Sequence, residues 1–340
     1  MRTILPLLIL ALLSSLFLSC NKTKKAEEIT QISIDGMIQG SYYHISYFGK
    51  NEQKNNIKNG IDSVFGAIDK SISLWDTNSI INKVNDNIVT ELDNIFLDNF
   101  NHSQRISTLT DGAFDITVGG LVEAYGFARK NKIEITDKKI DSLLKYVGYK
   151  NISVKNSRLI KKIPQTKIDF NAIAQGYTTD KISEYLISKG VSSFIVDVGG
   201  EVRAMGEKPD NKKWTCAIET PSKDKDSQRE YDSYIELKDE SIVTSGNYRK
   251  FYIENGVKYS HTIDPKTGRS VKHSLLSASV LAKDATTADG LATAFMVMGL
   301  DKAIVWLSSH PEFEAHFIYN DQKGNYQTYT TKKLKGRLLK

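Results

Sequence analysis

The chain has 340 residues, of which 40% are hydrophobic and 25% are charged, as in an ordinary soluble globular protein. That length is enough for one large domain or for two of average size. The formal net charge is +6, but the 46 basic and 40 acidic residues are interspersed, so the composition does not indicate nucleic-acid binding.

The first 19 residues are typical of a secretory signal peptide, because one early arginine precedes an apolar run that is short for a membrane span. Ser19 and Cys20 resemble a bacterial lipoprotein cleavage site, although the two residues before Ser19 are unusual there. We therefore expect a lipid on Cys20, a tether over residues 20–30 and one domain over residues 31–340. The protein would then be anchored to a membrane on the extracytoplasmic, periplasmic side. An ordinary signal peptide with a chance cysteine is the alternative.

Hydrophobic periodicity and turn residues predict most of the regular elements. In chain order these are a strand or hairpin over 32–48, helices over 54–72, 95–106 and 137–147, a hairpin over 151–163, a helix over 177–189, strands over 194–198, 214–218 and 233–237, a hairpin over 249–263, a strand over 277–281, helices over 285–298 and 303–307, and strands over 315–319 and 326–330. Because they lack strict βαβ order, we expect an α+β fold with a mixed β-sheet core flanked by helices. No G-x-G-x-x-G motif follows a strand. Cys216, the only cysteine besides Cys20, is expected to be buried, inert and without a disulfide partner.

Two loops have the composition of ligand-binding segments. Residues 73–79 are polar around Trp75, whose ring either packs against the protein or stacks on a flat ligand. Residues 111–120 contain three glycines and two aspartates. That segment is therefore either a surface turn or a place where the backbone approaches a ligand.

The segment 168–181 is expected to join a strand to a helix. Residues 167–170 alternate in polarity as the end of a strand does, and a helical face follows from Tyr177. Asp169 would thus lie near a helix start, whose unpaired N–H groups suit a phosphate. The alternative is that Asp169 simply caps the helix.

Asp289 and Thr293 lie four residues apart in an expected helix, with roughly 5–6 Å between their β-carbons. A carboxylate and a hydroxyl at that spacing can bind one hard cation, Mg²⁺ or Ca²⁺. Zinc is disfavoured, because the six histidines are scattered and no Cys/His set has zinc spacing. Alternatively, Asp289 is a first-turn carboxylate that the helix dipole favours.

His261 precedes the turn residues Asp264 and Pro265. A histidine at such a place can serve as a general base, although a lone histidine is usually structural. A hydrolase triad of Ser245, His261 and Asp264 is conceivable, but the chain has no G-x-S-x-G elbow.

Eight segments, taken in order, resemble the FAD:protein FMN transferase (ApbE) family. They are 39–43, 73–85, 111–127, 168–180, 194–206, 243–248 (VTSGNY), 261–268 (HTIDPKTG) and 288–294 (ADGLATA). Each is weak alone, but together they span most of residues 36–299.

The resemblance implies an enzyme that binds FAD in a cleft and, with Mg²⁺, links the FMN half of FAD through its phosphate to a Thr or Ser hydroxyl of an acceptor protein, releasing AMP. It places Mg²⁺ on Asp289, Thr293 and the carbonyl of Ala172, and it makes His261, the candidate base, and Asp289 the catalytic residues. It assigns eight residues to the FAD site: Gln39, Trp75, Ala113, Phe114, Asp115, Asp169, Gln175 and Ile263. The implied acceptors are subunits of membrane electron-transport complexes of the NADH:quinone reductase or Rnf type.

Two positions depart from the family pattern, which usually has Lys in place of Gln175 and Met in place of Gln39. The missing positive charge either weakens FAD binding or is compensated by Lys181 or another cation. Two other functions stay open: an Mg²⁺-dependent FAD pyrophosphatase that gives FMN and AMP, and a non-catalytic flavin-binding lipoprotein.

Overall fold

The computed structural model describes residues 29–89, 91–128, 134–221, 230–247, 251–254 and 257–339. The expected signal peptide, Cys20 and nearly all of the expected tether therefore lie outside the described residues. The first described residue, Ile29, already belongs to strand β1 (Ile29–Ile38), slightly before the expected start of the domain. Within the described part of the chain, no helix combines the length and the apolar character needed to cross a membrane.

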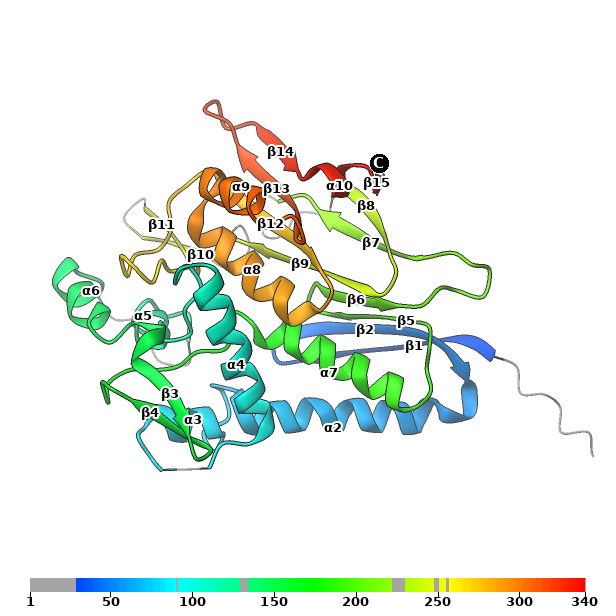
Figure 1. Cartoon of the computed structure of the whole chain (residues 1–340), viewed down its shortest axis with the longest axis horizontal. Coiled ribbons are helices and arrows are strands. Elements are labelled where there is room, and N and C mark those ends of the chain that lie inside the picture. Colours follow the sequence, from blue (N-terminus) through cyan, green and yellow to red (C-terminus); the bar gives the residue numbers. More distant parts are fainter. Residues whose placement is uncertain are drawn as a thin grey trace, which may run out of the picture.

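An eight-stranded sheet forms the centre of the molecule (Figure 1). Its order is β1-β2-β5-β6-β9-β12-β13-β14, with β2 (Ser41–Lys50), β5 (Phe194–Val198), β6 (Glu201–Met205), β9 (Glu240–Gly246), β12 (Leu275–Ala282), β13 (Glu314–Asn320) and β14 (Tyr326–Thr330). The α+β class is confirmed, and the sheet is antiparallel at every pairing rather than mixed. Tight turns join β1 to β2 and β5 to β6, and because such turns reverse the chain they account for these two pairings.

Helices cover one face of this sheet. In Figure 1, α2 (Lys54–Ile72), α7 (Ala174–Ser188) and α8 (Ala285–Met298) lie across it, with α4 (Asn94–Leu109) and α9 (Leu300–Ser308) beside α8. The predicted bounds of α2 and α8 are confirmed. Helix α2 buries an isoleucine and phenylalanine stripe at helical spacing. Helix α8 is buried on most sides, and its buried residues include Thr286, Thr287 and Asp289 as well as apolar side chains.

A small sheet covers part of the other face. It has the order β15-β8-β7, with β15 (Leu338–Leu339), β8 (Tyr231–Leu237) and β7 (Trp214–Glu219). Alternation along the large sheet supplies both cores. Val243 and Val280 pack in the helix-side core, whereas their neighbours Ile242 and Leu281 pack with Trp214 of β7.

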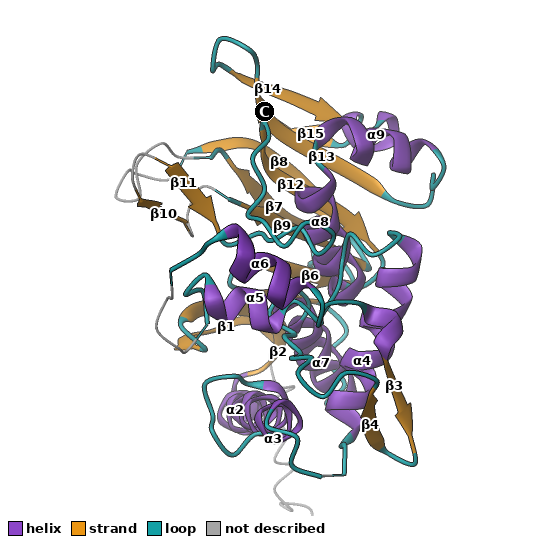
Figure 2. Cartoon of the chain, turned by 90° about the vertical axis from the view of Figure 1, so that its left-hand side faces the viewer, coloured by secondary structure: helices purple, strands orange, loops and turns teal. Residues whose placement is uncertain are grey.

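The remaining elements are short, and several of them lie on the side of the molecule that faces the viewer in Figure 2. They are α3 (Ile80–Asn85), α5 (Gly119–Ala124), α6 (Asp137–Leu144), β3 (Ile152–Lys155), β4 (Arg158–Lys161), β10 (Phe251–Glu254), β11 (Val257–Ser260), α10 (Lys332–Lys335) and the 3-10 helices Asn51–Gln53 and Tyr149–Asn151. The strand expected to end at residue 170 is wrong. Lys167 makes only an isolated bridge to Val118, and the chain then turns toward α7.

Candidate active site

One cavity of about 1520 Å³ is lined by all twelve residues that the sequence assigned to FAD, metal or catalysis. They come from the β1–β2 turn, the loop after α2, the glycine-rich loop at 111–120, the segment before α7, the first turn of α7, helix α8 and the turn after β11. The cavity exceeds the roughly 300–1,000 Å³ of typical small-molecule sites, so it has room for a dinucleotide. Sharing a cavity does not fix the role of each residue, and those roles stay predictions.

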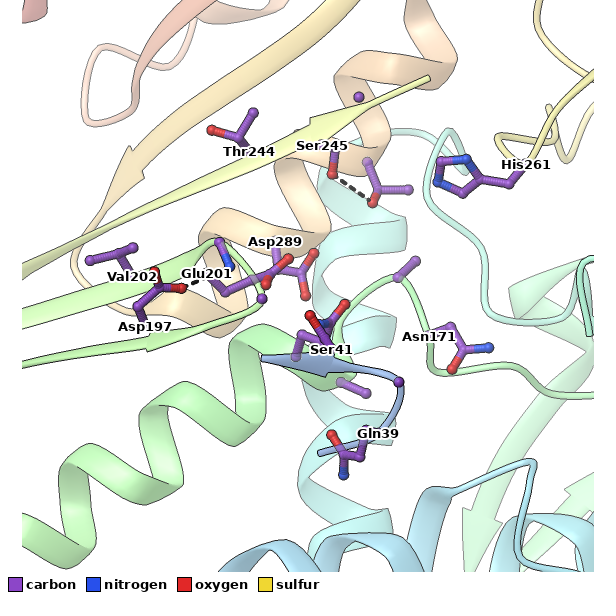
Figure 3. A pocket seen from close by; sticks show the side chains of 18 of the residues that line it. Gln39, Ser41, Asn171, Asp197, Glu201, Val202, Thr244, Ser245, His261 and Asp289 are labelled. Atoms are coloured by element: carbon purple, nitrogen blue, oxygen red, sulfur yellow. Dashed lines mark hydrogen bonds between the residues drawn. The ribbon is translucent and has the colours of Figure 1, made fainter. Parts of the chain in front are cut away.

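The crossing of α7 and α8 holds the expected metal ligands. Asp289 is 4% exposed, and its Oδ2 accepts a hydrogen bond from the Gly176 backbone N–H at 3.0 Å. A β-carbon on Gly176 would lie 2.4 Å from the Ala285 carbonyl oxygen, so the two helices touch at this point. One turn along α8, the Thr293 hydroxyl lies 3.3 Å from Ser245 Oγ. Figure 3 shows Asp289, Ser245 and Ser41 around the same hollow.

The donor set fits a hard cation. A carboxylate, a hydroxyl and the Ala172 carbonyl are all oxygen donors, which Mg²⁺ prefers. The described residues contain no group of three or more His, Cys, Asp or Glu side chains suited to a metal. The expected Mg²⁺ ligands include only one such side chain, Asp289, because the other two donors are a hydroxyl and a backbone carbonyl.

A carboxylate that the sequence reading missed fixes the start of α8. Asp180 of α7 accepts hydrogen bonds from the backbone N–H groups of Ala285 and Thr286 at 3.0 and 2.8 Å, and from the Thr286 hydroxyl. It also pairs with Arg203 of β6 at 2.5 Å. Because Asp180 is 5% exposed, these partners offset the cost of burying its charge. The signal for it was available, since a carboxylate on the buried side of a helix requires partners.

Asp169 lies before α7 but does not cap it. The N-cap residue of α7 is Ile173, so the capping alternative is wrong. The Asp169 carboxylate instead accepts the Asn171 backbone N–H at 2.7 Å and lines the cavity. Burial raises the pKa of Asp169 to about 6, against a weaker opposing effect of the Asn171 hydrogen bonds.

This raised pKa predicts a pH-dependent stability. Between pH 3.8, the ordinary value, and about 6 the folded state binds more protons at Asp169 than the unfolded state does, so the free energy of unfolding falls as pH rises through that window. The loss is about 3 kcal/mol for a shift of this size, and it levels off above the folded pKa. Urea unfolding of wild type and Asp169→Asn at several pH values measures it. Parallel stability curves for the two proteins would contradict the assignment.

Asp115 shapes the glycine-rich loop. Its Oδ1 accepts from the Thr117 N–H and hydroxyl at 2.8 and 2.6 Å, and its Oδ2 accepts from the Tyr149 N–H at 2.8 Å. Burial raises its pKa, whereas these hydrogen bonds lower it. Both oxygens thus hold the loop, which brings the neighbouring Ala113 and Phe114 to the cavity wall.

The loop with Trp75 is held by Asn82, another residue that the sequence reading missed. Asn82 Nδ2 donates to the carbonyl oxygens of Leu74 and Asp76 at 3.1 and 2.7 Å. The Trp75 ring is 61% exposed and lines the cavity, so it is not a packing residue of the core. A rigid loop that presents an exposed indole suits stacking on a flat ring.

His261 lines the cavity, and its ring lies edge-on to Phe127. Figure 3 shows the imidazole pointing toward the side of the cavity that Ser245 occupies. Asp264 holds the following turn, since its oxygens accept from the Lys266 N–H at 2.8 Å and the Thr267 hydroxyl at 3.0 Å. The contacts of Ser245 and Asp264 thus give both residues roles other than those of a hydrolase triad.

Comparison with known proteins identifies the family, because the model of the ApbE family matches residues 39–317. This chain belongs to the ApbE family. The FAD:protein FMN transferase of Vibrio cholerae is 33% identical over 302 residues, which cover 87% of this chain and 89% of that protein. The Haemophilus influenzae protein of the same name is 30% identical over 299 residues, 84% of each chain.

Solved structures agree with this membership. The flavin transferase ApbE from Vibrio cholerae superposes with a TM-score of 0.81 at 30% identity, covering 91% of this chain and 100% of that one. The flavinyl transferase ApbE of Pseudomonas stutzeri, in its apo form, gives a TM-score of 0.81 at 28% identity, covering 91% and 97%. The resemblance found in the sequence is therefore confirmed.

The two departures from the ApbE pattern have defined surroundings. Gln39 adopts a φ of 52°, and its Nε2 donates to Asp69 Oδ1 at 2.7 Å. The Gln175 amide packs against Gly199, where an added β-carbon would lie 2.4 Å from Nε2. Lys181 does not line the cavity and instead pairs with Glu184 and Asp98, which argues against it as the cation that compensates for Gln175.

The cavity of this ApbE protein is strongly acidic. Among the described residues that line it, Lys208 is the only lysine or arginine. Seven carboxylates face it: Asp69, Asp115, Asp169, Asp197, Glu201, Glu219 and Asp289. A pyrophosphate in such a place needs a cation. Cys216 also lines the cavity and is half-buried, whereas the sequence predicted a buried residue. Burial together with the charge of Asp197 raises the pKa of its thiol to about 12, which disfavours the reactive thiolate.

Proposed function

We propose that this protein is an FAD:protein FMN transferase that depends on Mg²⁺. The observation that supports the proposal is the α7–α8 crossing, where Asp289 and Thr293 line the same cavity as the residues that the ApbE resemblance assigns to FAD. An oxygen of a Thr or Ser side chain forms the new bond to the FMN phosphorus, the pyrophosphate bond of FAD breaks, and AMP leaves. The proton of the attacking hydroxyl passes to a base.

The residues of the cavity supply position and charge. Phosphoryl transfer depends on alignment and on neutralising negative charge more than on covalent help from the protein. Asp289, Thr293 and the Ala172 carbonyl would hold Mg²⁺, which when bound offsets the charge of the pyrophosphate. Asp180 keeps α8 in register with α7, and the loops around Trp75 and Asp115 bound the space for FAD.

His261 is the proposed base, and replacing it tests that role. His261→Ala is expected to lower kcat by ~10²–10⁴, because the acceptor hydroxyl loses its proton acceptor, and to leave FAD affinity unchanged. His310→Ala is a matched control, since His310 does not line the cavity and its ring stacks on Trp306. Single-turnover labelling rates of both variants decide it. An unchanged rate for His261→Ala would exclude general-base catalysis by that residue.

Incubation with FAD, Mg²⁺ and an acceptor protein tests the activity itself. Fluorescent flavin that stays on the acceptor in a denaturing gel, with AMP released, is the expected result. Release of FMN and AMP without labelling would favour the pyrophosphatase, and intact FAD bound without turnover would favour the flavin-binding lipoprotein.

We further propose that the acceptors are extracytoplasmic parts of NADH:quinone reductase or Rnf-type complexes and that Cys20 carries a lipid. The lipoprotein-like leader of the sequence supports this location, because a secreted, tethered enzyme meets those parts of a membrane complex. Mass spectrometry of the mature N-terminus checks the lipid.

A further inference from the structure

The cavity continues beyond the residues assigned to FAD and metal, toward strand β7. Four consecutive residues of β7, Trp214 through Ala217, line it. Successive side chains of a strand point to opposite faces of its sheet. A strand whose consecutive residues all line one cavity therefore presents its edge to that cavity, not a face.

That edge is available for pairing within the described structure. β7 is the outer strand of the sheet β15-β8-β7, and its register with β8 runs from Trp214 opposite Leu237 to Glu219 opposite Tyr231. Among the described strands, none pairs with the other side of β7. The N–H and C=O groups of such an edge can pair with a further extended chain.

The opposite wall is a polar sheet face. Tyr42, His44 and Ser46 of β2 line the cavity as alternate residues, whereas Tyr43, Ile45 and Tyr47, which alternate with them, face the helix-side core. In β5, Asp197 lines it in the same way. The Tyr42 hydroxyl donates to Asp197 Oδ2 at 3.2 Å, so a side-chain hydrogen bond links the β2 and β5 parts of this wall.

The wall runs directly into the catalytic part of the cavity. Asp197 Oδ1 accepts the Gly200 N–H at 2.8 Å, which fixes the β5–β6 turn. An added β-carbon on Gly199, in the same turn, would meet both Gln175 Nε2 and Ser41 Oγ. Figure 3 shows Asp197, Ser41 and Asp289 in one pocket. A chain lying between the wall and β7 would thus lead to the place where the hydroxyl must react.

We propose that the acceptor protein binds here by strand addition. The acceptor groove consists of the β7 edge (residues 214–217) and the polar wall of Tyr42, His44, Ser46 and Asp197. An extended segment that bears the acceptor Thr or Ser pairs with β7 through its main chain, and the polar wall contacts its side chains. This inference rests on the proposed function, since a transferase, unlike a pyrophosphatase, must admit a second polypeptide.

Two arginine variants at positions that pair across β7 and β8 test the groove. Ala217→Arg fills it, whereas Tyr234→Arg changes the cross-strand partner on β8, which does not line the cavity. With the extracytoplasmic domain of an Rnf-type subunit as the acceptor, Ala217→Arg is expected to raise the KM for acceptor about tenfold or more, as the loss of one or two net hydrogen bonds would. Its Kd for FAD, from flavin fluorescence, should stay that of wild type, and Tyr234→Arg should match wild type in both.

A proline pair tests the main-chain bonds. Neighbouring N–H groups of β7 point to opposite edges, so of Thr215→Pro and Cys216→Pro one removes a bond to β8 and the other a bond to the acceptor. The variant that breaks the bond to β8 is expected to lower Tm. The variant that breaks the bond to the acceptor is expected to keep the wild-type Tm but to lose labelling of the acceptor. If Ala217→Arg labelled the acceptor with the same KM as wild type, or if both proline variants labelled it fully, the proposed groove would be wrong while the proposed function would stand. Absence of wild-type labelling would overturn the proposed function itself.

Discussion

Replacing Asp289 with alanine is expected to abolish FMN transfer while the domain stays folded. Asp289 provides the single carboxylate of the expected metal site, and its Oδ2 also accepts a hydrogen bond from the Gly176 backbone N–H. A metal that stabilises the charge of the transferring phosphoryl group contributes several kcal/mol, so we expect a loss of ~10³-fold or more. Labelling of the acceptor at saturating FAD, across a titration of Mg²⁺, measures this loss.

Asp284→Ala is the matched control for this variant. Asp284 belongs to the same helix as its N-cap, where it accepts the Thr287 N–H at 2.7 Å, but it does not line the cavity. Its loss should cost about 1 kcal/mol of stability through the missing cap and leave transfer intact. Full activity of Asp289→Ala in Mg²⁺ buffer would rule out the metal role, and equal losses in both variants would indicate a structural effect.

The sequence predicts local elements well where one face is buried and the ends are marked. Helix α2 ends at Ile72, the last residue of its apolar stripe, and α8 ends at Gly299, whose φ of 77° suits glycine. Strand pairing is different, because β2 pairs with β5, about 150 residues later in the chain. No local pattern contains that information, so an antiparallel sheet of this order was out of reach.

The same distinction applies to the candidate site. Residues with proposed chemical roles, such as Asp289, Thr293 and His261, could be singled out from their types, their spacing and the resemblance of their segments to a family. Asn82 and Asp180 were missed, because what makes them important is their partners: loop carbonyls for the first, and the start of a helix 105 residues away for the second. Such supporting residues become visible when the folded chain brings their partners together.

The acidity of the cavity links the site to its chemistry. Burial of Asp169 and Asp115 raises the pKa of both, so the protein stores unfavourable charge where a phosphate ligand must enter. A bound cation reduces the repulsion among the carboxylates and the repulsion between them and the phosphates, because it attracts both groups. FAD is therefore expected to bind more weakly without Mg²⁺ than with it.

The contact between α7 and α8 is expected to tolerate no side chain at Gly176. A β-carbon there would lie 2.4 Å from the Ala285 carbonyl oxygen and 2.7 Å from Asp289 Cβ. Both are atoms that cannot rotate away, so Gly176→Ala must push the helices apart. We expect a loss of about 1–3 kcal/mol in the free energy of unfolding, together with loss of transfer, because the Gly176 N–H also orients the Asp289 carboxylate.

Gly66→Ala separates this effect from the general effect of alanine in a helix. Gly66 lies within α2, and a β-carbon on it would meet no heavy atom within 4 Å. Alanine there reduces the freedom of the unfolded chain and should stabilise the protein by about 0.4–1 kcal/mol, with transfer unchanged. The two variants are chemically identical, so opposite signs in urea unfolding can come only from the space around each glycine. If Gly176→Ala were as stable and as active as Gly66→Ala, α7 and α8 would not touch at that glycine, and the placement of Asp289 would have to come from elsewhere in the fold.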